Sequence, residues 1–201
     1  WRAKTVGTFD CEFGFSCMGY EIAGAWGQKM ANPGRDVLAL VGDGSYLMLN
    51  SELVTAVAEG IKIIVILIQN HGYASIGHLS ETVGSERFGT LYREYDGSAR
   101  NFQGQQTLPV DLAMNARSYG MDVIEVEPGP DAIADLSAAV ARAKASDRAT
   151  FIHINSDPLI YAPDGESWWD VPVSETSTLP STLRARAEYE AQVAAQKPLL
   201  G

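Results

Sequence analysis

Two polar residues directly follow apolar runs and could bind a ligand together. Asp43 lies in a Gly-Asp-Gly-Ser turn after the apolar run 37–41, and Asn70 comes soon after the run 63–68. A crossover between parallel strands brings their carboxyl ends to one edge of a sheet. Ligands of open α/β sheets bind outside that edge. We therefore expect Asp43 and Asn70 to be neighbours in a ligand site.

The turn has the composition of a phosphate site. Gly42 and Gly44 allow close backbone approach, and the helix expected after Ser45 presents free N–H groups and a positive dipole end. The Asp43 carboxylate would repel a phosphate unless a cation lay between them. Mg²⁺ takes one or two protein oxygen ligands together with phosphates. Asp43, Asn70 and a main-chain carbonyl just beyond it are therefore predicted metal ligands.

Other interpretations of the turn stay open at this point. The chain has no GxxxxGK[ST] motif, and the residues after Gly44 do not complete GxGxxG. An Asp in such a turn can also simply cap a helix. The turn alone therefore does not decide between a ligand site and a structural role.

The elements that would position these residues alternate along the chain. Strands are expected at 37–41, 63–68, 121–127 and 150–155. Helices are expected at 18–30, from the Gly-Asp-Gly-Ser turn to about 59, and at 110–119, 130–145 and 182–196. The continuous apolar runs are typical of parallel strands buried on both faces, while 72–101 reads as irregular with one short helix. The pattern predicts an α/β fold, a doubly wound, mostly parallel sheet with helices on both faces.

Composition limits the class of protein. With 201 residues, 46% of them hydrophobic, the chain can form one α/β domain with or without a tail. The net charge of −10 argues against nucleic acid and anionic membranes as partners. Only Cys11 and Cys17 are present, so we expect reduced thiols in a cytoplasmic protein. Without an initiator Met or a signal peptide, the chain is expected to begin inside a longer gene product.

The Gly-Asp-Gly turn, with Asn70 some 27 positions after its Asp, resembles the fingerprint of the thiamine diphosphate (ThDP) enzymes. The resemblance implies that ThDP and Mg²⁺ are the cofactors. Its metal ligands carry over to Asp43, Asn70 and the carbonyl of Gly72. A second Asn is frequent after the first in this family, and this chain has His71 there.

A second segment, FSCMG at 15–19, resembles the stretch that meets the two rings of the cofactor. Met18 would wedge between the rings, and the Ser16 carbonyl would accept from the 4′-amino group. The residues alone equally allow Met18 to be a core methionine. His71 and Tyr73, which follow the metal-binding Asn, are candidates for catalysis or substrate contact.

The same resemblance implies parts that this chain lacks. The activating glutamate is expected in an N-terminal pyrimidine-binding domain, of the same or a neighbouring subunit, so Glu12 and Glu21 are assigned structural roles. Residues 1–175 would form the diphosphate- and Mg²⁺-binding domain, and 176–201 a C-terminal linker and helix. The pyrimidine-binding and middle domains would be absent. A homodimer or tetramer is expected, because such sites are built between subunits.

Longer segments resemble one branch of the family. EFGFSCMGYEIAGAWG, GDGSYLMLNSELVTAVAEG, PVDLAMNARSYG and GESWWDVPVSE are similar to enzymes of myo-inositol breakdown. These hydrolyse a C–C bond and open the ring of a trihydroxylated cyclic diketone to give 5-deoxyglucuronate. One alternative is a ThDP-dependent 2-oxo acid decarboxylase or acetolactate-synthase-like carboligase. Another is a regulatory module that binds a nucleotide or Mg²⁺ without catalysis.

Two histidines and two tryptophans are assigned structural places. His153 lies in an expected strand and should be a hydrogen-bonded core histidine. His78 is expected on a loop surface. Trp168 and Trp169 are expected to pack at a subunit interface, since paired tryptophans seldom remain in water.

Overall fold

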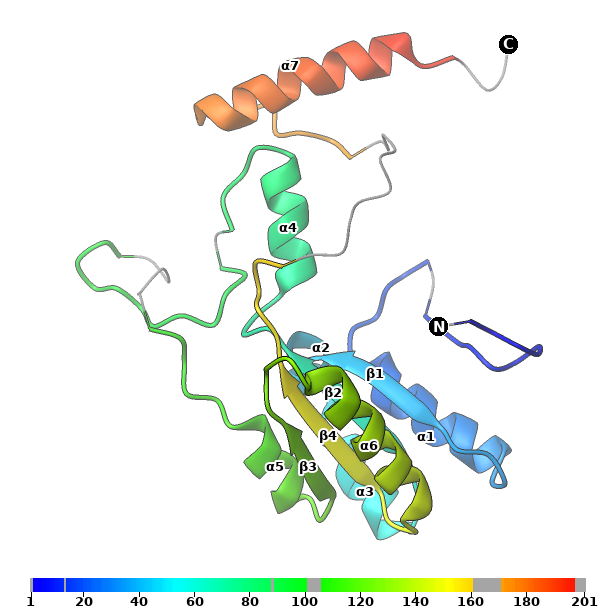
Figure 1. Cartoon of the computed structure of the whole chain (residues 1–201). Coiled ribbons are helices and arrows are strands. Elements are labelled where there is room, and N and C mark those ends of the chain that lie inside the picture. Colours follow the sequence, from blue (N-terminus) through cyan, green and yellow to red (C-terminus); the bar gives the residue numbers. More distant parts are fainter. Residues whose placement is uncertain (1, 13, 88, 101–105, 161–170, 198–201) are drawn as a thin grey trace. The chain divides into compact units, whose positions relative to one another are not determined.

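The computed structural model describes residues 2–12, 14–87, 89–100, 106–160 and 171–197 (Figure 1). The chain divides into two compact units, and each is described by itself. The first comprises Trp1–Asn70 and Pro109–Asp157, and the second His71–Leu108 and Pro158–Gly201.

A parallel four-stranded sheet with the order β1-β2-β4-β3 organises the first unit (Figure 1). Its strands are β1 (Leu38–Gly42), β2 (Ile64–Gln69), β3 (Asp122–Val126) and β4 (Thr150–Asn155). Each lies within one or two residues of the position that its apolar run predicts. The register pairs Gly42 with Ile68 and Gln69 with Asn155, so these strands end at a common edge.

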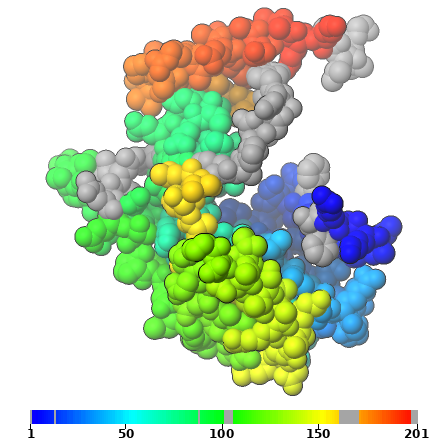
Figure 2. Space-filling model, viewed as in Figure 1, coloured from blue at the N-terminus to red at the C-terminus, as the bar shows by residue number. Residues whose placement is uncertain are grey.

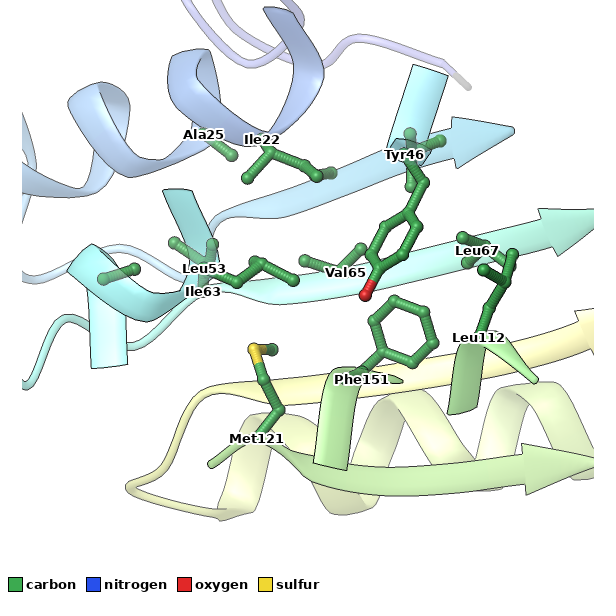
Figure 3. Close-up of a cluster of buried hydrophobic side chains, with 14 residues drawn as sticks. Ile22, Ala25, Tyr46, Leu53, Ile63, Val65, Leu67, Leu112, Met121 and Phe151 are labelled. Atoms are coloured by element: carbon green, nitrogen blue, oxygen red, sulfur yellow. The ribbon is translucent and has the colours of Figure 1, made fainter. Parts of the chain in front are cut away.

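Helices cover both faces of this sheet, which confirms the predicted doubly wound α/β fold. The helices of the first unit are α1 (Tyr20–Ala31), α2 (Asp43–Leu49), α3 (Glu52–Ala58), α5 (Leu112–Ser118) and α6 (Ala132–Ala145). α1, α2, α3 and α5 share one apolar core with inward side chains of β1, β2 and β4 (Figure 3). At its centre the rings of Tyr46 and Phe151 pack with centroids 5.3 Å apart.

α6 covers the other face, with Ala139 and Ala143 packed among Ile64, Ile66 and Ile152. In Figure 2 this helix lies at the surface toward the viewer, in yellow-green. Its small residues allow close approach to the β-branched side chains of the strands, because protein cores fill at near-crystalline density.

The prediction that β1 is buried on both faces was wrong. Ala39 and Val41 are buried in the shared core, whereas Leu40, on the opposite face, is 58% exposed. β1 is an edge strand of the sheet within the described residues, and α6 packs over β2, β3 and β4. An apolar run shows that both faces of a strand carry apolar side chains. It does not show how far the helix on one face extends over the sheet.

The single helix expected after the Gly-Asp-Gly-Ser turn is divided into α2 and α3. Asn50 and Ser51 separate them but keep right-handed helical dihedral angles. Two i→i−3 hydrogen bonds, from Leu53 to Asn50 and from Val54 to Ser51, tighten the chain there. The Asn50 side chain also donates to Oδ1 of Asn115 in α5, at 3.3 Å, and so links the junction of α2 and α3 to α5.

The second unit contains α4 (Ala74–Thr82) and α7 (Pro180–Ala195). α4 is the short helix predicted within 72–101, and α7 begins two residues before its prediction, with Pro180 in its first turn. The carbonyl of Gly84 accepts from the hydroxyls of Ser181 at 2.7 Å and Thr182 at 2.8 Å. These bonds hold the start of α7 against the end of the α4 segment.

Among the described residues, no helix combines the length and apolarity needed to cross a membrane. The predicted functional bounds, 1–175 and 176–201, stay predictions.

Candidate functional site

Asp43 is the first residue of α2 and follows β1 directly. Its side chain is fully buried, at 0% exposure, and Oδ1 accepts from the N–H of Gly44 at 3.1 Å. Burying a neutral polar group without a hydrogen bond costs roughly 2–7 kcal/mol, and burying a charged carboxylate costs more. Hydrogen-bond donors or a cation compensate for this cost. A cation beside Asp43 would add to this compensation.

Asn70 is half-buried and follows β2 directly. Gly42 and Ile68 are register partners on neighbouring parallel strands, which lie about 4.8 Å apart. Asp43 is one residue beyond the first partner and Asn70 two beyond the second. The structure thus has both residues at one edge, while their role as metal ligands stays a prediction.

The other residues of the turn differ in burial. Gly44 and Ser45 are buried, and Gly42 is half-buried. A Cβ atom built on Gly42 would meet nothing within 4 Å, so packing inside this chain does not require a glycine there. The space beside its main chain could admit a ligand, which fits the predicted cofactor contact.

The oxygen donors at this edge suit Mg²⁺ better than zinc. Within the described ranges, no three His, Cys, Asp or Glu side chains gather as a metal-binding group. Zinc sites in proteins normally use three or four such side chains. Mg²⁺ is instead often held by one or two carboxylates with substrate phosphates. Asp43 with the Asn70 amide matches the second pattern.

The segment predicted to meet the cofactor rings leads into α1. Ser16 is exposed and has a left-handed backbone, with φ +48°, which is uncommon for a non-glycine residue. Met18 is 38% exposed, so its alternative assignment as a core methionine was wrong. A Cβ atom on Gly19 would lie 2.7 Å from Cβ of Leu49, so a glycine is needed where this segment meets α2.

Two acidic side chains hold this segment. Glu12 accepts from the N–H of Cys17 at 2.7 Å, and Glu21 accepts from the N–H of Gly19 at 3.0 Å. Both glutamates thus make structural contacts, and their exclusion as the activating acid stays a prediction. Their bonds fix the main chain on either side of Met18.

His71, Gly72 and Tyr73 belong to the second unit. His71 has φ +59°, and a Cβ atom on Gly72 would lie 2.2 Å from the Thr90 carbonyl oxygen. The N–H of Tyr73 donates to that same oxygen at 2.7 Å, so this stretch is held tightly against the following loop. Catalytic roles for His71 and Tyr73, and metal binding by Gly72, stay predictions.

The remaining aromatic assignments have mixed outcomes. His78 lies in α4 and is half-buried, so its prediction as a loop-surface residue was wrong. The loop assignment failed because Gly and Ser favour turns, and their presence here obscured the helix Ala74–Thr82. Trp168 and Trp169 lie outside the described residues.

Sequence reasoning missed a polar contact behind Asn70. Nε2 of His153 lies 2.6 Å from Oε1 of Gln69, and the Gln69 amide nitrogen donates to the Val110 carbonyl at 3.3 Å. His153 is only 8% exposed, so its prediction as a hydrogen-bonded core histidine is confirmed. A glutamine ending an otherwise apolar strand was the signal that could have located its partner.

Several known proteins are similar to this chain. The 3D-(3,5/4)-trihydroxycyclohexane-1,2-dione hydrolase of Bacillus thuringiensis (strain Al Hakam) is 38% identical over 96% of the chain. A hydrolase of the same name from Bacillus anthracis is 39% identical over the same share. The chain spans 29% of the length of each of these relatives.

A solved structure gives a similar result. The thiamine diphosphate-dependent 4-hydroxybenzoylformate decarboxylase of Rhodococcus jostii RHA1 is 25% identical, with a TM-score of 0.51. The similarity covers 70% of this chain and 23% of that one. The profile of the thiamine pyrophosphate enzymes, C-terminal TPP binding domain, matches residues 1–154, thiamine pyrophosphate being another name for ThDP. With the parallel sheet and the paired strand ends that carry Asp43 and Asn70, this match shows that the chain belongs to the thiamine pyrophosphate enzyme family, as a C-terminal cofactor-binding domain.

Proposed function

We propose that this chain holds the diphosphate of ThDP through a Mg²⁺ ion at the carboxyl edge of the sheet, with Asp43 and Asn70 as protein ligands. The observation that carries the proposal is their placement just beyond Gly42 and Ile68, partners in the β1–β2 register. Membership of a ThDP-binding family supports the choice of cofactor. The Gly72 carbonyl is the third ligand that the family fingerprint implies.

Electrostatics support a cation between Asp43 and the diphosphate. A fully buried carboxylate and a diphosphate would repel each other strongly in a low-dielectric environment. A divalent cation between the two groups attracts the carboxylate and the diphosphate alike, and so replaces their repulsion by two attractions. The Asn70 amide oxygen adds a neutral ligand, so the site gains coordination without further negative charge.

We further propose that the protein to which this chain belongs hydrolyses 3D-(3,5/4)-trihydroxycyclohexane-1,2-dione. The supporting observation is the 38–39% identity over 96% of the chain to hydrolases of that name. When bound, ThDP supplies an electron sink for cleaving a bond beside a carbonyl group. The residues of this chain would bind and orient the cofactor, with His71 and Tyr73 as candidates for contact with the polyhydroxylated ring.

A ThDP-dependent decarboxylase is the second candidate function. It is favoured by the similarity to the 4-hydroxybenzoylformate decarboxylase, at a TM-score of 0.51. The hydrolase has more support, because its identity is higher and extends over more of the chain. Both candidates use the same proposed metal site.

The cofactor proposal is tested by titrating ThDP into the longest protein expressed from the gene that carries this chain. Tryptophan fluorescence is followed with Mg²⁺ and with EDTA. Asp43→Asn should weaken Mg²⁺-dependent binding by about 100-fold or more, equivalent to losing roughly 3 kcal/mol of charged interaction. Asp36→Asn is the matched control, because Asp36 lies before the opposite end of β1 and pairs with Lys62 and Lys144.

Equal ThDP affinity in Asp43→Asn and wild type would refute the metal site. The reaction is tested separately, by offering the same preparation the cyclic diketone, a benzoylformate and pyruvate. Turnover of the diketone alone supports the hydrolase, and turnover of a 2-oxo acid alone supports the decarboxylase or carboligase. The proposed homodimer or tetramer is checked by light scattering of that preparation.

A further inference from the structure

A buried polar pair lies directly behind Asn70, on the sheet face that α2 and α5 cover. Gln69 ends β2 at 3% exposure, and His153 lies on the neighbouring strand β4. Their side chains meet at 2.6 Å although 84 positions separate them in the chain. Leu67 and Phe151, the preceding inward residues of the two strands, lie in the apolar core.

The direction of the hydrogen bonds follows from the third partner. The Val110 carbonyl can only accept, so the Gln69 amide must present its NH₂ group to it and its oxygen to His153. His153 therefore carries its proton on Nε2 and donates it to Gln69. The two hydrogen bonds therefore point the same way, from His153 to Gln69 and from Gln69 to the Val110 carbonyl.

The main chain of Gln69 is held as well. Its carbonyl accepts from the N–H of Ser156 at 2.8 Å, just beyond the end of β4. Gln69 is thus held by side-chain bonds to β4 and to the segment before α5, and by a main-chain bond to Ser156. The next residue along the chain is Asn70.

We propose that Gln69 and His153 are positioning residues that fix the backbone from which the Asn70 amide extends, and so set the Mg²⁺ affinity of the cofactor site. This inference rests on the proposed function, in which Asn70 is a metal ligand. A metal ligand must be held within about 0.5 Å of its productive position. Partners behind a ligand commonly change metal affinity by about 10- to 100-fold when removed.

Packing alone does not require these two residues to be polar. An apolar pair of similar shape can stabilise a buried position equally well. A directional bond adds something that apolar packing lacks, because it allows one side-chain orientation and resists rotation of the strand end. That property matters at the last residue of β2, where the regular ladder stops and Asn70 begins.

The test uses His153→Leu, which removes the donor, and His153→Gln, whose amide nitrogen reaches about the same position as Nε2. ThDP binding to the longest expressed protein is followed by fluorescence while Mg²⁺ is varied. His153→Leu should raise the half-saturating Mg²⁺ concentration by about 10- to 100-fold, and His153→Gln should stay within about threefold of wild type. At saturating Mg²⁺, ThDP affinity should recover in His153→Leu.

Ile152→Val is the control for destabilisation alone. Ile152 is the fully buried neighbour of His153 on the other face of β4. This substitution should lower the melting temperature and leave the Mg²⁺ requirement unchanged. If it raises that requirement as His153→Leu does, a general loss of stability explains the effect and the inference fails.

The remaining outcomes separate the inference from the proposed function. Wild-type protein that binds ThDP without any Mg²⁺ requirement overturns both. A normal Mg²⁺ requirement in wild type and in His153→Leu overturns the inference and leaves the proposed function standing. If His153→Leu does not fold, Gln69→Met serves instead, since it removes the hydrogen bonds to His153 and Val110 while keeping the length of the side chain. An unchanged Mg²⁺ requirement in that variant is equally decisive against the inference.

Discussion

The hydroxyl of Tyr46 donates a 2.7 Å hydrogen bond to Oδ1 of Asn115, and so joins α2 to α5 across 69 positions of sequence. Asn50 donates to the same oxygen at 3.3 Å. Tyr46 is also fully buried against Phe151. The helix that begins with Asp43 is therefore fixed to its neighbours by apolar packing and by a polar bond.

We expect Tyr46→Phe to lower the free energy of unfolding by about 1 kcal/mol, because the ring packing remains and one hydrogen bond is lost. Urea unfolding at pH 7 measures the change. Tyr20→Phe is the comparison, since its hydrogen bond to Asp10 is exposed and should contribute less. A larger loss in Tyr20→Phe would contradict the importance given to the α2–α5 contact.

Alkaline pH should destabilise the protein through the same tyrosine. Burial raises the pKa of Tyr46 above its ordinary value of 10.0. Above pH 10 the unfolded chain loses this proton while the folded protein keeps it, so the contribution to stability is complete below pH 10 and falls as pH rises. The fall approaches about 1.4 kcal/mol per pH unit.

Free energies of unfolding at pH 9 and pH 11 test this, with Tyr46→Phe beside wild type. The wild type should lose more stability over this interval, because the variant lacks the titrating group while all other tyrosines and lysines are shared. Parallel losses in the two proteins would show that Tyr46 ionises normally.

Gly84→Ala should loosen α7 in the second unit. A Cβ atom on Gly84 would lie 2.5 Å from the Ser181 carbonyl oxygen. Gly89 has a similar left-handed backbone, but a Cβ atom there would meet nothing within 4 Å. Gly89→Ala therefore carries only the backbone cost, of about 1–2 kcal/mol.

Limited proteolysis distinguishes the two alanine variants. Cleavage within Pro180–Ala195 should be faster in Gly84→Ala than in wild type, and unchanged in Gly89→Ala. Equal cleavage of both variants would mean that the clash with Ser181 is absorbed without moving the helix.

Ser16 should act through its main chain. We expect Ser16→Ala to leave ThDP affinity within about twofold of wild type, because the proposed acceptor is the carbonyl oxygen. Ser16→Gly should relieve the left-handed strain, stabilising the fold by up to about 1 kcal/mol, and should weaken ThDP binding because the segment becomes more flexible. Calorimetric titration measures affinity, and a strong loss in Ser16→Ala would instead indicate a role for the hydroxyl.

The strands and most helices could be predicted because each depends on local pattern. β2 and β4 carry the apolar runs that parallel strands require, and both were placed within one residue. The exposed face of β1 and the break at Asn50 depend on residues far away in sequence. No local pattern contains the position of α6 or the pairing of Asn50 with Asn115.

The same difference between local patterns and long-range contacts applies to the candidate site. Asp43 and Asn70 could be brought together from sequence, because the handedness and connection of a parallel crossover determine which strand ends meet. Gln69 and His153 could not be paired, since strands β2 and β4 are adjacent only through a long connection. Sequence located His153 in a core strand but contained no information about the strand beside it.

The order of strands in the sheet also determines when the protein can fold during synthesis. β2 lies between β1, made just before it, and β4, whose His153 follows Gln69 by 84 residues. At about 5–20 residues per second, the ribosome needs roughly 4–17 s to supply that partner. Throughout this interval a strongly apolar strand has one unpaired edge. The nascent chain is therefore most vulnerable to mispairing, and most in need of a chaperone, after β2 emerges and before β4 does.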